Sequence, residues 1–599
     1  MEQIKRLENN KRQKLSLNII KFEDLSNEII YEIFEYLNFH ESFQCFYDLN
    51  QRFQNLFINS NYPIEIHLSS ISKSLFQRFL TNIIHSQCYR IKSLHLSNPF
   101  ISDMVLLTNF LQLQSLILDK IQSNSIEILL DSLYSLPMLH SLTIKSIDNT
   151  RNLDHIYKQI FRLPLLKYCE ISIKTLKVSV SLPFATNQFS SIESLIIKHK
   201  ISSNHISILL SYVPNLRYLS LENLDGSNRN RNTQSISLNN LTHISLKLLY
   251  IPFNEFELLV KDFFQHVQIL CLLVHDGYSL HDEYLNANRW EELITNNLRN
   301  LRIFDYQYEC IAENYNNGHH QYETHVKQFE SSFWLNRQWI LQYRHYRKYI
   351  DHALFYSINS KYKLILFFKI YFLFFFRQKH YMLDDQINET NVHLIHHLEI
   401  RNLNTIIQFL GYFPNVNQLT LSDTFNMPRN FIQNSFNRIL PLKQLTKLNL
   451  HCHQFLFEQI LDLLSYTINV HTLEFDSILL NRSTSFLIQQ TETFQFISNI
   501  NKIKNVIIRK EITFDKIELC LYLFRQLEFL TINLHKWDLE SIVRCILLET
   551  NDHMRYLSSL CISKQRSDFF KSVKILIDSE ELLHDYVLKL IDGRVHLWW

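Results

Sequence analysis

The sequence predicts an α/β fold: a short all-helical module followed by a solenoid of strand and helix repeats. In such a solenoid, parallel strands form the concave face and helices form the convex face. Three observations lead to this prediction. A hexad with three apolar positions recurs through most of the 599 residues, prolines recur at a fixed distance before it, and residues 22–57 instead carry apolar side chains at helical spacing.

The hexad is apolar at its first, fourth and sixth positions, as in Ile91, Leu94 and Leu96. Successive first positions are separated by 22, 26, 27, 26, 24, 25, 26 and 34 residues, and the pattern resumes after an interruption. Amphipathic stretches such as 125–133 and 205–212 lie between hexads, so each repeat is predicted to contain one strand and one helix. The hexads begin at residues 91, 113, 139, 166, 192, 216, 241, 267 and 301, and again at 395, 416, 445, 470, 503, 527 and 557.

Four prolines stand two residues before the first apolar residue of a hexad. Proline lacks the backbone N–H that a helix interior requires, so it ends the helix and directs the chain into the next strand. A helix stop and a strand start that recur together at one offset indicate a true repeat. These prolines are Pro137, Pro164, Pro214 and Pro414.

The period and the hexad together resemble the leucine-rich repeat. Because side chains alternate along a strand, the third and fifth hexad positions face the concave side, away from the core. The fifth positions form a mixed row of polar and weakly acidic residues with no basic stripe, which favours recognition of a protein. The predicted target-binding residues on this row are His95, Thr143, Glu170, Ser220, Glu399 and Glu474.

The all-helical module begins with a helix that is apolar on two sides. Ile29, Ile33 and Leu37 recur every four residues, and a second row lies beside them. Ser26 is predicted to cap this helix, and Glu28 complements the positive end of its dipole. Two shorter segments with the same spacing follow. A unit this small cannot bury all of its apolar surface, so the surplus is expected to dock on something else.

The residue pattern of this module resembles an F-box. The matching pieces are Leu25-x-x-Glu28-Ile29-Ile30, Ile33-Phe34-x-Tyr36-Leu37 and Leu49-Asn50-x-Arg52-Phe53-x-x-Leu56; Ser26 replaces the usual proline, and Glu41-Ser42-Phe43 replaces the usual opening of the second helix. The resemblance implies binding to a Skp-type adaptor and through it to a cullin. The residues that would bind the adaptor are Leu25, Ile29, Ile30, Ile33, Phe34, Leu37, Leu49, Arg52 and Phe53.

The combined resemblance, to an F-box protein with leucine-rich repeats, implies the substrate-recognition subunit of a Skp-cullin-F-box ubiquitin ligase. Such a subunit is not an enzyme and has no catalytic residues. The alternative is a structural interaction scaffold, unconnected to ubiquitin, whose helical module merely caps the solenoid. A third hypothesis, a metal-dependent hydrolase, depends on the histidine clusters at 451–453 and 393–397. No Cys or His pair stands at zinc-finger spacing, so no metal or cofactor is expected.

The predicted organisation has five parts. The segment 307–394 fits neither the hexad nor the helical-module pattern. Its apolar run 364–376 is shorter than the about 20 residues that a membrane-spanning helix needs, so a buried helix is favoured. That the run is translated from a retained non-coding stretch is an open hypothesis. Aromatic and basic residues between Trp334 and Tyr349 suggest either base stacking or, more simply, a core. The parts are a basic flexible arm (1–19), an F-box-like three-helix module (20–60), a first repeat array (61–306), an irregular aromatic and basic insertion (307–394), and a second array with a C-terminal cap (395–599).

Composition excludes several function classes. Sixty Lys and Arg against 58 Asp and Glu give a net charge of +2, so no overall field favours nucleic acid or an anionic membrane. Only five glycines occur, too scattered for a phosphate-binding loop. The nine cysteines form no C-x-x-C pair and predict reduced, mostly buried thiols. The start of the chain lacks the apolar core of a signal peptide, which favours the cytoplasm, the nucleus or both.

Overall fold

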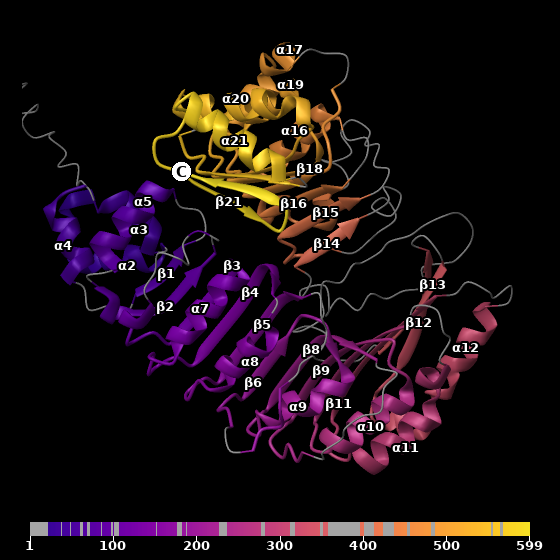
Figure 1. Ribbon diagram of the computed structural model, residues 1–599. Helices are drawn as coiled ribbons and strands as arrows, with labels where there is room; N and C mark the ends of the chain where they lie inside the picture. The colour runs from indigo at the N-terminus through magenta and orange to yellow at the C-terminus, as the bar shows by residue number, and fades with distance from the viewer. Residues whose placement is uncertain are drawn as a thin grey trace, which may run out of the picture.

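The computed structural model contains two parallel β-sheets and a helical module (Figure 1). It describes residues 22–37, 39–47, 49–59, 64–68, 72–84, 87–97, 100, 107–150, 152–175, 182–186, 189–226, 236–276, 282–311, 318–347, 351–357, 396–400, 412–422, 436–451, 456–480, 485–552, 555–563 and 567–599.

The first sheet is a parallel ladder from β1 to β11, in which neighbours along the chain are neighbours in space and β7 is a short side strand on β8. Each of the nine hexads predicted between residues 91 and 306 contains one of its strands. The strands are β1 (Ile64–Leu68), β2 (Ile91–Leu96), β3 (Ser115–Ile121), β4 (Ser141–Thr150), β5 (Tyr168–Thr175), β6 (Ser194–Ile197), β7 (Ile201–Ser202), β8 (Tyr218–Asp225), β9 (His243–Leu249), β10 (Ile269–Asp276) and β11 (Ile303–Ile311).

The register of the ladder places equal hexad positions opposite each other. Leu94 pairs with Leu116, and Leu116 pairs with Leu142. All three side chains are fully buried. Identical positions of successive repeats therefore form one continuous apolar core, which is the reason that the repeats hold together.

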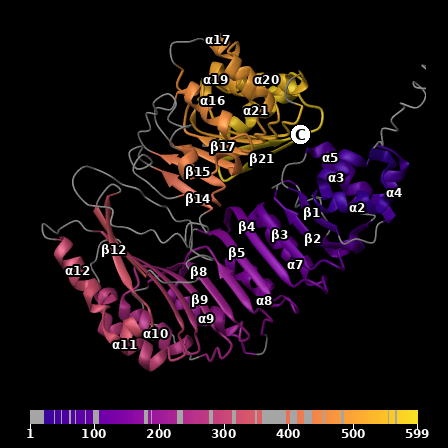
Figure 2. The same cartoon turned by 180° about the vertical axis from the view of Figure 1, so that it is seen from behind.

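Helices cover the outer side of this curved sheet in both views (Figures 1 and 2). Each presents one apolar row to the sheet, as α7 does with Ile126, Leu130 and Leu133, which are at most 2% exposed. The opposite sheet face is consequently the inner, concave one. The helices of this array are α5 (Lys73–Phe79), α7 (Ser123–Leu133), α8 (Leu153–Phe161), α9 (Ile206–Ser211), α10 (Phe253–Phe263) and α11 (Ala287–Asn297).

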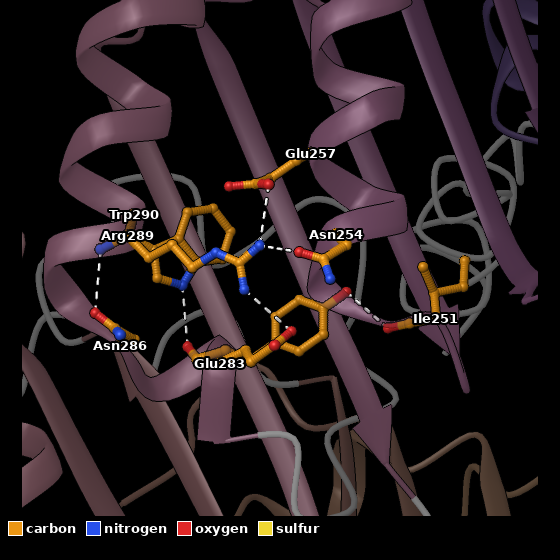
Figure 3. A network of polar contacts seen from close by, with 8 residues as sticks. Ile251, Asn254, Glu257, Glu283, Asn286, Arg289 and Trp290 are labelled. Carbon is orange, nitrogen blue, oxygen red and sulfur yellow. Dashed lines mark hydrogen bonds and ion pairs between the residues drawn. The ribbon is translucent and has the colours of Figure 1, made fainter.

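A polar network fixes α11 against α10 (Figure 3). The Arg289 guanidinium forms ion pairs with Glu257 at 3.0 Å and Glu283 at 3.1 Å, and it lies 4.7 Å from the centre of the Phe253 ring. The Asn286 side chain caps α11 by accepting a hydrogen bond from the Arg289 backbone N–H. One cation thus joins two helices and the loop between them.

The first array ends in an antiparallel hairpin, β12 (Leu341–Arg347) and β13 (Asp351–Ser357), with β13 paired to β11. Two helices, α12 (Gly318–Gln328) and α13 (Ser332–Asn336), precede it. Trp334 and Trp339 are 1% and 8% exposed and belong to the core, so they are not available to stack on bases. Residues 318–347 and 351–357 are therefore a regular end of the first array, and the apolar run 364–376 lies outside the described residues.

The second sheet repeats this plan. Seven parallel strands correspond to the seven hexads from residue 395 onward, and an antiparallel pair closes the sheet. Its strands are β14 (His397–Ile400), β15 (Gln418–Ser422), β16 (Lys447–His451), β17 (Thr472–Phe475), β18 (Asn505–Glu511), β19 (Phe529–Asn533), β20 (Ser559–Ser563), β21 (Val587–Ile591) and β22 (Arg594–Trp598). Its helices are α15 (Asn437–Ile439), α16 (Phe457–Tyr466), α17 (Ser485–Gln489), α18 (Glu492–Ile500), α19 (Phe514–Leu523), α20 (Leu539–Asp552) and α21 (Ser567–Ser579).

The N-terminal module consists of a 3-10 turn (Phe22–Asp24) and the helices α2 (Asn27–Glu35), α3 (Phe39–Phe46) and α4 (Gln51–Asn59). It lies at the β1 end of the first array (Figure 1). None of the helices among the described residues is long and apolar enough to cross a bilayer.

Candidate protein-interaction surfaces

The helical module has a small aromatic core of its own. Ile30 and Phe53 are fully buried in it, together with Leu56. The Phe22 ring stacks on Phe46 at 5.2 Å and on Phe53 at 5.7 Å between centroids. The three helices and the 3-10 turn therefore converge on one point, and Ile30 and Phe53, both predicted to bind the adaptor, face inward.

Arg52 joins α4 to the start of α2. Its guanidinium donates hydrogen bonds to the backbone oxygens of Glu23 and Leu25 and to the side-chain oxygen of Asn27, the last at 2.7 Å. These bonds use carbonyl groups that the turn before α2 would otherwise leave unpaired. Arg52 thus fixes the position of α4 relative to the start of α2.

Ser26 occupies the N-cap position of α2, but its side chain makes no capping hydrogen bond to the backbone, contrary to the sequence prediction. The hydroxyl instead contacts the Glu28 carboxylate. Hydrogen bonds from the Glu28 backbone N–H and from Ser26, together with the Arg52 charge, lower the pKa of Glu28. The helix start is therefore stabilised by an ionised Glu28 near its positive end.

The outer face of α2, formed by Ile29, Ile33, Tyr36 and Leu37, points away from this core. Ile29 is 45% exposed and Tyr36 is 91% exposed, whereas Ile33 and Leu37 are half-buried. Ile29 and Ile33 lie on one side of α2, and Tyr36 and Leu37 follow at the C-terminal end of the helix. Such an apolar side of a short helix is the kind of surface that protein partners cover.

The adaptor-binding residues predicted from the sequence thus fall into two groups. Phe34 packs on Phe57, with ring centroids 4.8 Å apart, and so joins the inward group with Ile30 and Phe53. Leu49 is 48% exposed and Leu25 is half-buried. The group that reaches the surface is Leu25, Ile29, Ile33, Leu37 and Leu49.

The other side of the module packs on the first array. Phe43 and Phe57 belong to the same continuous core as β1 and β2, and the Phe43 ring lies edge-on to Phe79 of α5 at 5.1 Å. The buried Arg90 side chain donates a hydrogen bond of 2.9 Å to the Phe57 carbonyl. The module therefore caps the array on one side and leaves the outer face of α2 open on the other.

The predicted row of fifth hexad positions is continuous on the concave face. His95 pairs with Ile117, then Thr143, then Glu170, and the ladder carries the row on through Ser220. Thr143 is 7% exposed and Ser220 is 1% exposed, because curvature brings neighbouring strands together on this side. Longer side chains must therefore provide most of any contact surface.

A charged cluster lies on the concave face of β5, β6 and β8. Lys198 forms ion pairs with Glu170 at 3.0 Å and Glu222 at 3.5 Å, and Tyr168 donates a hydrogen bond to Glu170. Burial lowers the pKa of Lys198, but the hydrogen bonds and charges of the two carboxylates raise it by a larger amount, so the net shift of the pKa is upward. Burial and the adjacent Glu170 raise the pKa of Tyr168 to about 12.

The second array carries a matching cluster around Glu474. Its carboxylate contacts His451 at 3.4 Å and accepts a hydrogen bond from Arg509. Burial raises the pKa of Glu474, but the hydrogen bonds from His451 and Arg509 and the Arg509 charge outweigh it and lower the pKa to about 2. Asn449 and His397 both contact Thr420. The side chain of Glu399 lies outside the described residues.

Lys198, Glu222, His451 and Arg509 were not among the predicted binding residues. All four stand one residue after a hexad, at a seventh position that alternation also places on the concave side. A charged residue recurring at that position is the signal that identifies them.

The histidine and cysteine clusters were the basis of the metal-dependent hypothesis. Among the described residues no group of three or more His, Cys, Asp or Glu side chains is arranged to hold a metal ion. Cys452, His453 and His393 lie outside the described residues. The eight described cysteines are free thiols, and burial raises the pKa of Cys271 and Cys520 to about 12, so neither thiol forms a reactive thiolate.

Comparison with known proteins finds similarity among solved structures only. No family model matches the chain, and no curated protein matches it. Among solved structures, similar folds include a leucine-rich-repeat protein of Leptospira interrogans (16% identity, 72% of this chain and 97% of that chain, TM-score 0.24) and TLR13 in its complex with ssRNA13 (14%, 76% and 57%, TM-score 0.23). The mouse RP105/MD-1 complex is a third (12%, 83% and 78%, TM-score 0.20).

The fold assignment therefore depends on the chain itself. Hexads at leucine-rich-repeat spacing, one parallel strand per hexad and a register that stacks equal positions together define a leucine-rich-repeat solenoid. This fold supports a role as a protein-interaction scaffold.

Proposed function

We propose that this protein is the substrate-recognition subunit of a Skp-cullin-F-box ubiquitin ligase. The outer face of α2 binds a Skp-type adaptor, which connects to a cullin, and the concave face of the solenoid binds a target protein. The observation that carries the proposal is the division of α2: Ile30 and Phe34 pack in the module's own core, whereas Ile29 is 45% exposed and Ile33 is half-buried. A module that only capped the first array would not require an apolar side of α2 that is exposed to solvent.

This role requires no catalytic residue in the chain. Holding a target near an activated ubiquitin replaces a bimolecular encounter by an effectively unimolecular one and removes much of the entropic barrier. The proposal places the chain in the cytoplasm, the nucleus or both, where such ligases act. The clusters around Lys198 and Glu474 provide charged groups of both signs for target recognition.

The adaptor proposal is tested with Ile29→Asp combined with Ile33→Asp. Each buried aliphatic side chain contributes about 1.5–3 kcal/mol to an interface, so two buried carboxylates should weaken binding of a purified Skp-type adaptor by more than about 100-fold. Isothermal titration calorimetry with the full chain measures this. The matched control is Ile128→Asp on α7, where the isoleucine is 73% exposed and remote from the module.

Phe34 is left unchanged in this test because it packs on Phe46 and Phe57, and a charge there would unfold the module. Adaptor affinity equal to wild type in the double variant, with the control also unchanged, would contradict the docking assignment.

The second candidate function is an interaction scaffold without any link to ubiquitin. It is favoured by one observation: Phe43 and Phe57 of the module are part of the first array's core, so the module also has a capping role. A pull-down with the wild-type chain separates the two candidates. Capture of adaptor and cullin supports the ligase, and capture of neither supports the scaffold.

A further inference from the structure

The strand β22 contributes side chains to two different cores. Val595 and Leu597 are buried in the core of the second array. Trp598 is fully buried in the core of the first array. Its indole ring stacks on Phe100, which follows β2, with centroids 5.5 Å apart and an angle of 8° between planes, and it lies 6.1 Å from the Phe76 ring of α5.

Polar contacts accompany this insertion. The backbone N–H of Lys73 donates a hydrogen bond of 3.1 Å to the Trp599 carbonyl, and the Lys73 side chain forms an ion pair with Asp585. Lys73 is only 11% exposed, so this pair is partly shielded from water. Further contacts along the hairpin are Lys174 with Asp592 (3.1 Å), Lys589 with the Gln122 side chain (3.4 Å) and Lys589 with the Phe100 ring centre (5.4 Å).

The concave face of the second array is covered where it meets the first. Cys561 and His596, on the concave side of β20 and β22, are 4% and 8% exposed and lie 3.7 Å apart. Lys120, from the end of β3, lies 5.9 Å from the centre of the Phe529 ring on β19. The concave side of β19, β20 and β22 is thus the part of the second array that lies next to the first array.

The helix α5 lies between this junction and the helical module. Phe76 faces Trp598, and Phe79, one turn later, contacts Phe43 of α3. Both phenylalanines are fully buried. In Figures 1 and 2 the end of the second sheet lies beside α5 in both views. One helix of seven residues is therefore packed from both sides.

We propose that the hairpin β21–β22 is an intramolecular clasp that fastens the end of the second array to the start of the first and, through α5, fixes the orientation of the helical module. Neither array can change its position without withdrawing Trp598 from the core of the first. The inference does not require that the module binds an adaptor, so it stands or falls independently of the proposed function.

The first test compares Trp598→Ala with Leu473→Ala by hydrogen exchange of the full chain. Leu473 is fully buried in β17, away from the hairpin, and serves as the matched core truncation. Trp598→Ala should speed exchange of α5 about tenfold while β15–β18 keep their protection. Leu473→Ala should speed exchange around β17 and leave α5 within about twofold of wild type. Unchanged α5 protection in Trp598→Ala would overturn the proposal.

The second test remains informative if Trp598→Ala does not fold. Lys73→Glu and Asp585→Lys are made singly and together. A partly exposed ion pair typically changes an equilibrium about two- to fivefold, so each single variant should speed α5 exchange by that factor and the double variant should restore it. If the two single effects on the α5 exchange rate simply multiply in the double variant, the result would argue against the clasp. Exchange rates that change with a tenfold dilution would also overturn it, because the hairpin would then be docking on a second copy.

Discussion

The two arrays end in similar antiparallel hairpins, but the two hairpins make different contacts. In each, a parallel ladder is closed by an antiparallel hairpin, β13–β12 after β11 and β22–β21 after β20. The first hairpin buries Phe355 and Leu341 in its own array, whereas the second sends Trp598 into the other array. A closing hairpin protects the exposed edge of a parallel sheet. The difference lies in one aromatic side chain: Trp598, on the face of β22 opposite Val595 and Leu597, connects the second array to the first.

The largest expected effect that separates the two hairpins is that of Phe355→Ala. Phe355 is fully buried and lies 6.1 Å from Tyr308 and 6.0 Å from Tyr343, ring centre to ring centre. Removing the ring should lower the unfolding free energy of the first array by about 3–5 kcal/mol. Urea denaturation followed by hydrogen exchange should show the loss confined to the first array. Equal loss in β15–β18 would mean that both hairpins act as joints.

Acid should destabilise the first array through His199. Burial lowers the pKa of His199 to about 4, although a backbone hydrogen bond partly opposes this. The Ile173 backbone N–H donates a hydrogen bond to Nδ1, and the Tyr157 hydroxyl shares a hydrogen bond of 2.8 Å with Nε2. Because the unfolded state takes up a proton first, the first array should lose about 1–3 kcal/mol as pH falls from about 6.5 to 4. Urea titrations at both pH values measure the loss, and His199→Gln should reduce it, because burial also lowers the pKa of His95, His205 and His243 in the same array.

The second array should respond to acid at two groups, because burial lowers the pKa of His596 to about 4 and Glu474 titrates at still lower pH. The pKa of Glu474, about 2, lies below the usual value, so its contribution is present above about pH 4.5 and is lost as pH falls toward 2. Glu474 is 8% exposed, and we expect a contribution on the order of 1–3 kcal/mol. Glu474→Gln should flatten the decline of the second array below about pH 4.5, as monitored by exchange in β16–β18. A decline below this pH that the substitution leaves unchanged would contradict the assignment.

The smallest effect concerns the convex side of the first array, where Arg289→Lys keeps the charge but loses the planar fork. Arg289 contacts both Glu257 and Glu283 (Figure 3), which a single ammonium group cannot match. We expect a loss of about 1 kcal/mol in thermal or urea unfolding. The matched control is Arg217→Lys, whose guanidinium is 68% exposed and pairs only with Glu193 among the described residues. Equal effects of the two substitutions would show that the network contributes no more than a surface pair.

The repeats could be predicted because their signal is local and recurrent. Every hexad, from Ile91 to Leu557, contains a strand, since three apolar residues at fixed spacing dictate both the pleat and the buried side. The concave row followed from the same alternation. The binding roles assigned to the α2 residues and to that row stay predictions, and the structure adds which of these side chains reach the surface.

Contacts between residues that are far apart in the sequence could not be predicted. Periodicity made α2 apolar on two sides but gave no reason to choose which side faces inward, because that depends on Phe46 and Phe57 in later helices. The ion pairs of Lys198 and Arg509 depend on which strand lies next to which. Likewise, the sequence around Trp334 did not predict the antiparallel hairpin β12–β13, because its aromatic residues pack against residues of other strands.

Trp598 and Phe100 stack although they are 498 residues apart in the sequence. During synthesis Phe76 and Phe100 therefore lack this partner until residue 598 has been made. Repeats that contact only their neighbours can otherwise fold in order of synthesis. Here the packing of the first repeats is completed only after the whole second array has been translated, and until then their aromatic side chains offer apolar surface to chaperones.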